Sequence, residues 1–338
     1  LNLGVHSSLE MFIKWAMEEY PAKHYMLILD DHGDGWRGSM YEDDYDGEWV
    51  RSDYLTLHEL EQALKDSGLD KRKIDILGFV ACLMSMIEVA YQCRDFVDYV
   101  VFSQEYEPGD GWPYDDILSY LVSNPTTSPA NLAATIAQKY VQSYNWGSQG
   151  YDPNATQSAI NISALEKNVF RKLDRLIGEL LRNYDTYSGA ISNAIDNTET
   201  FYYSNEKDLI HFLMLLRDRV SDVGLIGLIE ETIDAINESI LYGGHLSGHS
   251  NAYGLSANFP SYYYSSYDNI LMSVHHQWDE FIRKQTGNDV DVWFYDITFV
   301  GSDSDGNGYF DSGTVYVDLD SDYSMTCLLY TSPSPRDR

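Results

Sequence analysis

Short apolar runs alternate with amphipathic helical stretches through the first half of the chain, and this alternation limits the fold more than any other feature. Three short runs, 25–29, 74–81 and 99–103, are predominantly apolar, and the first is apolar throughout, as strands buried on both faces are. Between the first two, the stretch 57–64 carries leucines at helical spacing. Strands separated by helices form parallel sheets covered by helices. The pattern predicts an α/β fold with a mostly parallel sheet.

Capping patterns mark where several helices should begin. Ser7 with Glu10, Thr56 with Glu59, and Ser163 with Glu166 each place a hydroxyl three residues before a carboxylate, as a capping box does. The other predicted segments are strands at 156–162 and 253–260 and helices at 208–220, 224–241 and 270–284. After Gly287 the pattern changes to strand-like alternation over 292–300 and 314–319.

Length and the change of pattern at Gly287 predict a division of the chain. Its 338 residues exceed the ~250–300 at which a single core usually stops growing. We expect a main domain over 1–287 and a small, truncated β-rich extension over 288–327. The Ser- and Pro-rich segment 328–338 breaks from the acidic composition before it, which indicates a non-native tail. Leu1 follows no methionine or leader pattern, so we expect an incomplete N-terminus.

Charge excludes two classes of partner. Fifty-three acidic residues against 22 basic residues give a formal charge of −31, and such a field repels phosphate backbones and anionic lipid headgroups. We therefore expect no nucleic-acid partner. No run of ~18 apolar residues occurs, so the sequence predicts no membrane span.

Polar and reactive residues follow two of the predicted strands directly. His32 and Gly33 come after the run 25–29, and Cys82 comes after the run 74–81. Ligands of parallel sheets bind outside the carboxyl ends of the strands, so the imidazole and the thiol should face one crevice if these strands are neighbours. The three cysteines, Cys82, Cys93 and Cys327, are too scattered for a disulfide scaffold or a zinc site, and at least one is unpaired.

A thiol and an imidazole in one crevice can carry out acyl transfer. The sequence after Cys82 reads as a helix, and its amino end together with the His32 imidazole would favour the thiolate that attacks a carbonyl. The N–H groups of Gly33 and Cys82 could hold the developing oxyanion, which contributes ~3 kcal/mol per donor. The alternative is that Cys82 is a small buried apolar residue and His32 an ordinary loop residue.

Three segments in register resemble the clostripain family of cysteine peptidases. The resemblance continues more weakly through Gly254-Leu255-Ser256 and Trp278-Asp279-Glu280-Phe281, so that it covers about residues 1–285. The three segments are Leu27-Ile28-Leu29-Asp30-Asp31-His32-Gly33-Asp34-Gly35-Trp36, Gly78-Phe79-Val80-Ala81-Cys82-Leu83-Met84-Ser85-Met86-Ile87-Glu88-Val89-Ala90-Tyr91 and Ser103-Gln104-Glu105-Tyr106-Glu107-Pro108-Gly109-Asp110-Gly111-Trp112-Pro113-Tyr114.

The resemblance implies a caspase-like fold and a peptidase that needs no cofactor for catalysis. Peptides or proteins would be its substrates, and a Cys–His dyad would cleave them after Arg or Lys. Residue by residue, Cys82 matches the family's nucleophile and His32 its general base. Asp110 matches an acidic residue of the pocket for the basic side chain, where a carboxylate can pair with an Arg fork. Family members are typically exported, so the resemblance implies an extracellular or cell-surface location.

One position departs from the family's pattern. The family usually has Asp two residues before the nucleophile, and this chain has Val80 there. Loss of that acid should cost ~2 kcal/mol or more in affinity for a basic side chain if nothing replaces it. We expect either a weakened basic preference that depends on Asp110 or a preference for another side chain. The alternative function is a catalytically silent surface or binding protein that keeps the fold.

Two weaker metal patterns remain. Asp303, Asp305, Asn307 and Asp311 place oxygen ligands at alternate positions around Gly308, and the stretch resembles the first half of a calcium loop. Position twelve is Thr314, so the loop is not a complete EF-hand, and a plain Asp/Gly hairpin turn is the alternative. His245 and His249 are separated by three residues, but the glycines around them argue against the helical geometry of a zinc pair.

Overall fold

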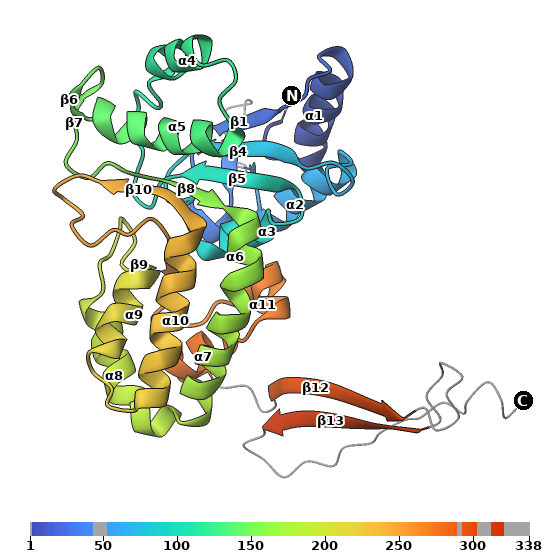
Figure 1. Ribbon diagram of the computed structural model, residues 1–338, viewed down its shortest axis with the longest axis vertical. Helices are drawn as coiled ribbons and strands as arrows, with labels where there is room; N and C mark the ends of the chain where they lie inside the picture. Colours follow the sequence, from blue (N-terminus) through green and yellow to red (C-terminus); the bar gives the residue numbers. More distant parts are fainter. Residues whose placement is uncertain (1, 43–52, 289–292, 303–311, 321–338) are drawn as a thin grey trace, which may run out of the picture.

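A five-stranded sheet forms the centre of the computed structural model, which describes residues 2–42, 53–288, 293–302 and 312–320 (Figure 1). The strand order is β1-β4-β5-β8-β10. β1 pairs in parallel with β4, and β4 with β5, whereas β8 is antiparallel to both of its neighbours. β10 therefore runs in the same direction as β1, β4 and β5. The strands are β1 (Met26–Asp30), β4 (Ile74–Val80), β5 (Val97–Phe102), β8 (Thr156–Asn161) and β10 (Ile240–His245).

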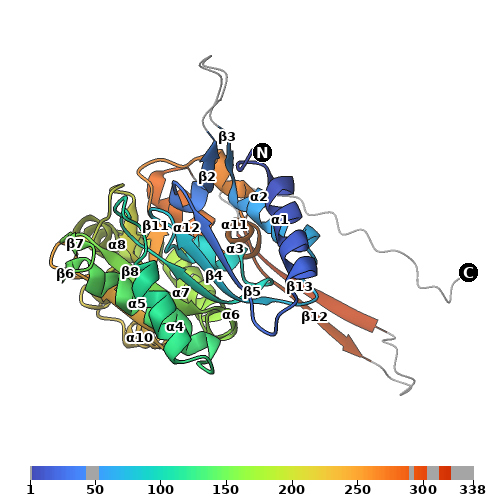
Figure 2. The same cartoon turned by 90° about the horizontal axis from the view of Figure 1, so that it is seen from above.

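Helices cover both faces of this sheet. Figure 2 shows α4 and α5 on one side and α1 and α2 on the other. Alternate residues of β4 serve the two sides, as the two-residue period of a strand requires: Leu77 and Phe79 join the larger core, and Ile76 and Val80 join the cluster under α5. These helices are α1 (His6–Glu19), α2 (Leu57–Asp66), α3 (Ile87–Gln92), α4 (Tyr114–Ser123), α5 (Pro129–Ser143) and α6 (Ile162–Asn168).

Beyond the β10 edge, further helices pack on one another and extend the larger core (Figure 1). They are α7 (Phe170–Arg182), α8 (Tyr184–Asn197), α9 (Leu209–Arg217), α10 (Val223–Ser239), α11 (Leu271–His275) and α12 (Trp278–Thr286). The short strands pair two by two, as β2 (Ser39–Glu42) with β3 (Asp53–Leu55), β6 (Asn145–Gly147) with β7 (Gly150–Tyr151), β9 (Glu206–Asp208) with β11 (Ser256–Asn258), and β12 (Trp293–Ser302) with β13 (Ser312–Asp320). Two 3-10 turns complete the elements, at Gly35–Arg37 and Ser265–Asn269.

The predicted mostly parallel α/β architecture is confirmed, and one of the three capping boxes is confirmed. Thr56 accepts from the Glu59 N–H, and the Glu59 carboxylate accepts from the Thr56 N–H. The box at Ser7 is wrong, because α1 begins one residue earlier, at His6, and has no side-chain cap. The box at Ser163 is also wrong, because Asn161 caps α6 by accepting from the Ala164 N–H.

Two predicted segments differ from the structure, and one strand was not predicted. The helix expected over 270–284 is broken into α11 and α12. The strand expected over 253–260 is only β11, and it pairs with β9 outside the main sheet. β10 was not predicted, because its glycines, Gly243 and Gly244, lack the apolar side chains that mark a strand in a sequence. In the described ranges, no helix combines the length and apolar character that crossing a membrane requires.

Candidate active site

The carboxyl ends of β1 and β4 bring the two predicted catalytic segments together. Asp30 pairs with Val80 in the sheet register, and the Asp31 N–H donates to the Val80 carbonyl at 3.2 Å. Gly33 then passes so close to the next strand's end that a Cβ there would lie 2.3 Å from the Cys82 carbonyl oxygen. Only glycine allows this approach. The turn that carries His32 therefore lies directly against the main chain of Cys82.

His32 is exposed in the turn after β1. Its N–H donates to Asp31 Oδ1 at 2.6 Å, and its carbonyl accepts from the Met40 N–H at 3.0 Å. The imidazole lies edge-on to the Tyr41 ring, with the ring centroids 6.4 Å apart. These contacts hold the main chain, and among the described residues no hydrogen bond occupies the two ring nitrogens.

Cys82 is half-buried at the end of β4. Its Sγ donates to the Glu107 carbonyl at 4.0 Å, and among the described residues no hydrogen bond joins it to the His32 ring. Catalytic hydrogen bonds are often long in an enzyme without substrate. Burial raises the pKa of the thiol, and the charges of Glu107 and Glu105 raise it further, while backbone hydrogen bonding at Glu107 lowers it in part. The resting thiol is therefore protonated and needs a base to react.

The prediction of a helix directly after Cys82 is wrong. α3 begins only at Ile87, so its amino end does not act on the thiol. The cause is that the loop after Cys82 forms hydrogen bonds with the segment after β5 in place of helical ones. The Leu83 N–H donates to the Glu105 carbonyl at 3.2 Å, and the Ser85 N–H donates to the Ser103 carbonyl at 2.8 Å. Leu83 adopts a φ of +66°, a left-handed conformation that is strained for a leucine.

Two backbone donors adjoin at the ends of the two strands. Within the part of the chain that the structure describes, the N–H groups of Gly33 and Cys82 donate to no backbone carbonyl, although their neighbours Asp34 and Leu83 do, and the Cys82 N–H also acts on its own thiol. The Cβ position built on Gly33 lies 3.0 Å from the Cys82 nitrogen, so the two residues adjoin. Free, adjacent N–H groups are what an oxyanion requires.

A buried ion-pair network that the sequence analysis missed braces the loop after Cys82. His249 Nε2 lies 3.1 Å from Glu105 Oε2, and its Nδ1 lies 3.2 Å from Glu199 Oε1. Burial lowers the pKa of His249, but the hydrogen bonds and charges of the two carboxylates outweigh burial, and the pKa is raised. Glu105 is the residue whose carbonyl holds the Leu83 N–H. His249 thus supports the chain next to Cys82.

The predicted substrate-binding residues lie on the same side of the sheet as α5. Val80 is buried, and a Cβ on Gly111 would lie 3.3 Å from its Cγ1, so the loop that carries Asp110 passes over Val80. Gly111 has a φ of +63°, which favours glycine there. The Asp110 side chain is exposed, and its carbonyl accepts from Gln149 Nε2 at 2.8 Å.

Glu107 is a second acid in this region that the sequence analysis did not single out. Its Oε1 accepts from Gln157 Nε2 at 3.0 Å and from Trp112 Nε1 at 3.3 Å, whereas its buried Oε2 has no partner among the described residues. Burial raises the pKa of this carboxyl to about 8. A sequence shows no signal for this, because the burial comes from residues of β8 and of the loop before α4.

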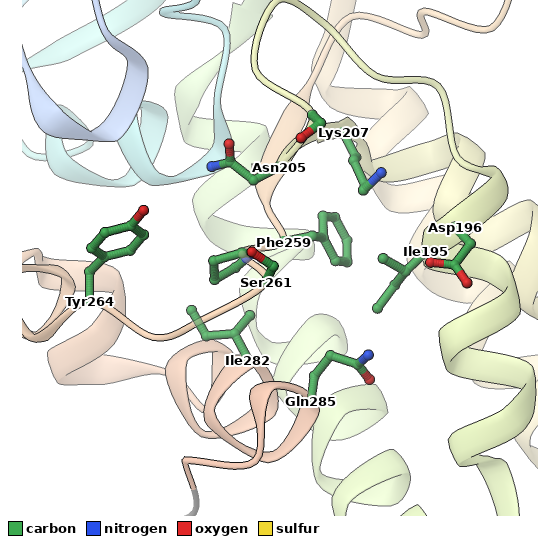
Figure 3. A pocket seen from close by; sticks show the side chains of 11 residues that line it. Ile195, Asp196, Asn205, Lys207, Phe259, Ser261, Tyr264, Ile282 and Gln285 are labelled. Carbon is green, nitrogen blue, oxygen red and sulfur yellow. The ribbon is translucent and has the colours of Figure 1, made fainter.

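The cavity in Figure 3 contains none of the predicted site residues. The calcium candidates Asp303, Asp305, Asn307 and Asp311 lie outside the described residues, as does Cys327. In the described ranges, no group of three or more His, Cys, Asp or Glu side chains could hold a metal ion.

Comparisons with known proteins agree with the resemblance found in the sequence. The model of the clostripain family matches residues 1–293. Clostripain of Hathewaya histolytica is 31% identical over 144 residues, which cover 38% of this chain and 26% of that protein. The chain thus spans about a quarter of the length of this relative.

Solved structures share the fold at lower identity. A secreted C11 cysteine protease from Bacteroides thetaiotaomicron, in complex with an irreversible peptide inhibitor, is 19% identical with a TM-score of 0.55, over 84% of this chain and 78% of the protease. An inactive zymogen C11 protease from Parabacteroides distasonis is 21% identical with a TM-score of 0.53, over 76% and 70% of the two chains. The fold is therefore that of the C11 proteases, and the family match over most of its length establishes that this chain belongs to the clostripain family.

Proposed function

We propose that the protein is a cysteine endopeptidase in which Cys82 is the nucleophile and His32 the general base. The observation that carries this proposal is the close approach of Gly33 to the main chain of Cys82 at the shared carboxyl end of β1 and β4. It supports a crevice in which a peptide carbonyl can meet a thiol, an imidazole and two N–H donors. Membership of a peptidase family and the peptide inhibitor bound by one structural neighbour add support.

The proposed reaction has two stages. His32 removes the proton from Cys82 Sγ as the sulfur attacks the peptide carbonyl, and the N–H groups of Gly33 and Cys82 receive the oxyanion. His32 then gives the proton to the departing amine, which leaves an acyl-enzyme. Water, deprotonated by His32, hydrolyses the thioester and releases the free acid. Since the Cys82 pKa is raised, proton removal during attack, rather than a resting thiolate, suits this site.

A peptide acyloxymethyl ketone tests the assignment directly. The reagent alkylates a nucleophilic thiol, so mass spectrometry of the labelled full chain should find the adduct on Cys82, and His32→Ala should suppress it. Hydrolysis of fluorogenic peptides should fail in the same variant. Absence of labelling and of hydrolysis in the unaltered chain would favour the second candidate, a silent binding protein, for which the apolar Val80 is the motivating observation.

For specificity we propose a basic side chain before the scissile bond, bound with reduced strength through Asp110. The exposed carboxylate on the loop that passes over Val80 supports this assignment. Asp110→Ala should raise KM for Arg peptides several-fold with little change in kcat, and Val80→Asp should lower KM. Arg cleavage at unchanged KM in Asp110→Ala would refute the role of Asp110, and profiling a peptide library would then identify the preferred side chain.

We also propose an exported location, a separate extension after residue 287 and a calcium site at 303–311. Relatives described as secreted support export. α12 ends at Thr286 with a left-handed Gly287, which supports a boundary there. Calorimetric titration of the full chain with calcium, compared with an Asp303→Asn/Asp305→Asn variant, tests the metal: a heat that the variant loses supports it, and no heat at millimolar calcium removes it.

A further inference from the structure

A cavity of about 420 Å³ lies between α8, the β9–β11 pair and α12, away from Cys82 (Figure 3). Its walls combine a cation, an anion, hydroxyl groups and an apolar surface. Lys207 and Asp196 carry the charges, and Phe259 and Ile282 supply apolar surface. The remaining lining residues are Ile195, Ser204, Asn205, Pro260, Ser261, Tyr264 and Gln285.

Lys207 is the unusual member of this lining. Only 7% of the residue is exposed, yet among the described residues its ammonium has no hydrogen bond and no carboxylate within 4.0 Å. Figure 3 shows the side chain aimed into the cavity. Burial lowers its pKa, and the more distant Asp196 only partly opposes that effect. Most of the residue is buried, but solvent in the cavity reaches the ammonium nitrogen, where an anionic ligand can pair with it.

The main chain holds Lys207 in this position. Lys207 pairs with Ala257 in the β9–β11 ladder and bridges to Thr200 on its other side. The backbone that carries the ammonium is therefore part of a sheet and not of a free loop, while the side chain keeps its own rotatable bonds. A preformed cavity reduces the ordering cost of binding a small ligand.

Asp196 restricts the chemistry of the ligand further. It is exposed at the rim and faces the same cavity as Lys207, but the two charged groups are more than 4.0 Å apart. A carboxylate at Lys207 and an ammonium at Asp196 would satisfy both charges, and the hydroxyls of Ser204 and Ser261 can donate to the same carboxylate. Phe259 and Ile282 leave room for an apolar substituent. We propose that this cavity binds a small zwitterion, a free α-amino acid with an apolar side chain.

The cavity and the peptidase crevice share one segment of chain. Phe201 and Tyr203 belong to the small apolar cluster that contains Cys82, and Ser204, Asn205 and Lys207 line the cavity. A ligand in the cavity would therefore brace the segment that packs beside the thiol. The binding itself does not depend on peptidase activity, so its test stands apart from the test of Cys82.

Calorimetric titration of the full chain with L-leucine tests the proposal. We expect saturable, millimolar binding, no binding of leucinamide, which lacks the carboxylate, and weaker binding of N-acetyl-L-leucine, which lacks the ammonium. Lys207→Met should reduce leucine affinity by roughly tenfold or more, while Lys14→Met, a change at an exposed lysine paired with Glu10, should not.

Asp196→Asn keeps the test informative if Lys207→Met fails to fold, because Asp196 is exposed. It should weaken leucine binding by several-fold and leave N-acetyl-L-leucine binding unchanged. No saturable heat with leucine, equal binding of leucinamide, or unchanged affinity in a folded Lys207→Met variant would each overturn the proposal.

Discussion

Cys82 and Cys93 both have thiols with a raised pKa, but they differ in burial and in their neighbours. Burial raises the pKa of both, that of Cys93 to about 12. Cys93, however, is completely buried in the larger core at the end of α3, where its N–H donates to the Val89 carbonyl. Cys82 is only half-buried, and its main chain lies against Gly33, next to the exposed His32. Access and a neighbouring base, rather than resting acidity, distinguish a candidate nucleophile from a packing residue.

The largest expected effect on activity comes from replacing the Cys82 thiol, with the replacement of Cys93 as the comparison. Cys82→Ala should reduce peptide hydrolysis by roughly 10³-fold or more and abolish acyloxymethyl ketone labelling, because no other described thiol reaches the crevice. Cys93→Ala is the matched control and should retain labelling. Mass spectrometry that finds the adduct on Cys93 would reverse the comparison.

Removing the base should have the next largest effect. His32→Ala should lower the rate of Cys82 acylation by roughly 10²- to 10⁴-fold, since a thiol with a raised pKa depends on proton removal during attack. His58→Ala removes an exposed imidazole on α2, away from the crevice, and should leave the rate unchanged. Stopped-flow labelling of the two variants decides, and equal rates would exclude His32 as the base.

Replacing each cysteine by serine should change the free energy of unfolding more at Cys93 than at Cys82. Cys93→Ser buries a hydroxyl in an apolar setting and should lower the free energy of unfolding by about 1–3 kcal/mol. Cys82→Ser, in a half-buried crevice, should cost less. Urea unfolding of both variants measures the difference, and an equal loss would contradict the contrast in burial.

The smallest effect concerns the brace beside Cys82. His249→Gln removes the cation between Glu105 and Glu199, and the labelling rate should fall roughly tenfold, or about 1.4 kcal/mol. Because the folded pKa of His249 is raised, its contribution to stability is complete at acid pH and is lost as the pH rises through that pKa. The unfolding free energies of the unaltered protein and the His249→Gln variant should therefore converge toward alkaline pH. A difference that does not change with pH would argue for a purely steric role.

Sequence reasoning succeeded at the elements whose signals are local. The apolar runs at β1, β4 and β5 and the capping box at Thr56 identify themselves without tertiary contacts. The same apolar runs place His32 and Cys82 after two strands, and these strands are parallel neighbours in the structure. The resemblance to the clostripain family rested on these same segments, and the family match confirms it.

The failures have one physical origin, which is competition from contacts distant in the sequence. Leu83 and Ser85 satisfy their N–H groups on the chain after β5, so the helical pattern after Cys82 is not realised before Ile87. Because glycines obscure β10, nothing in the sequence indicated that His249, four residues beyond that strand, returns to the crevice to meet Glu105.

By itself, the sequence determined the α/β class, the strands that carry His32 and Cys82, and the family, since these depend on apolar periodicity and on motifs of contiguous residues. Only the tertiary structure decided which groups surround the thiol, that desolvation raises the pKa of Glu107 to about 8, and that Lys207, unpaired among the described residues, faces a cavity. Burial and charge pairing are properties of residues brought together from separate segments, and they determine the pKa values and ligand chemistry of a site.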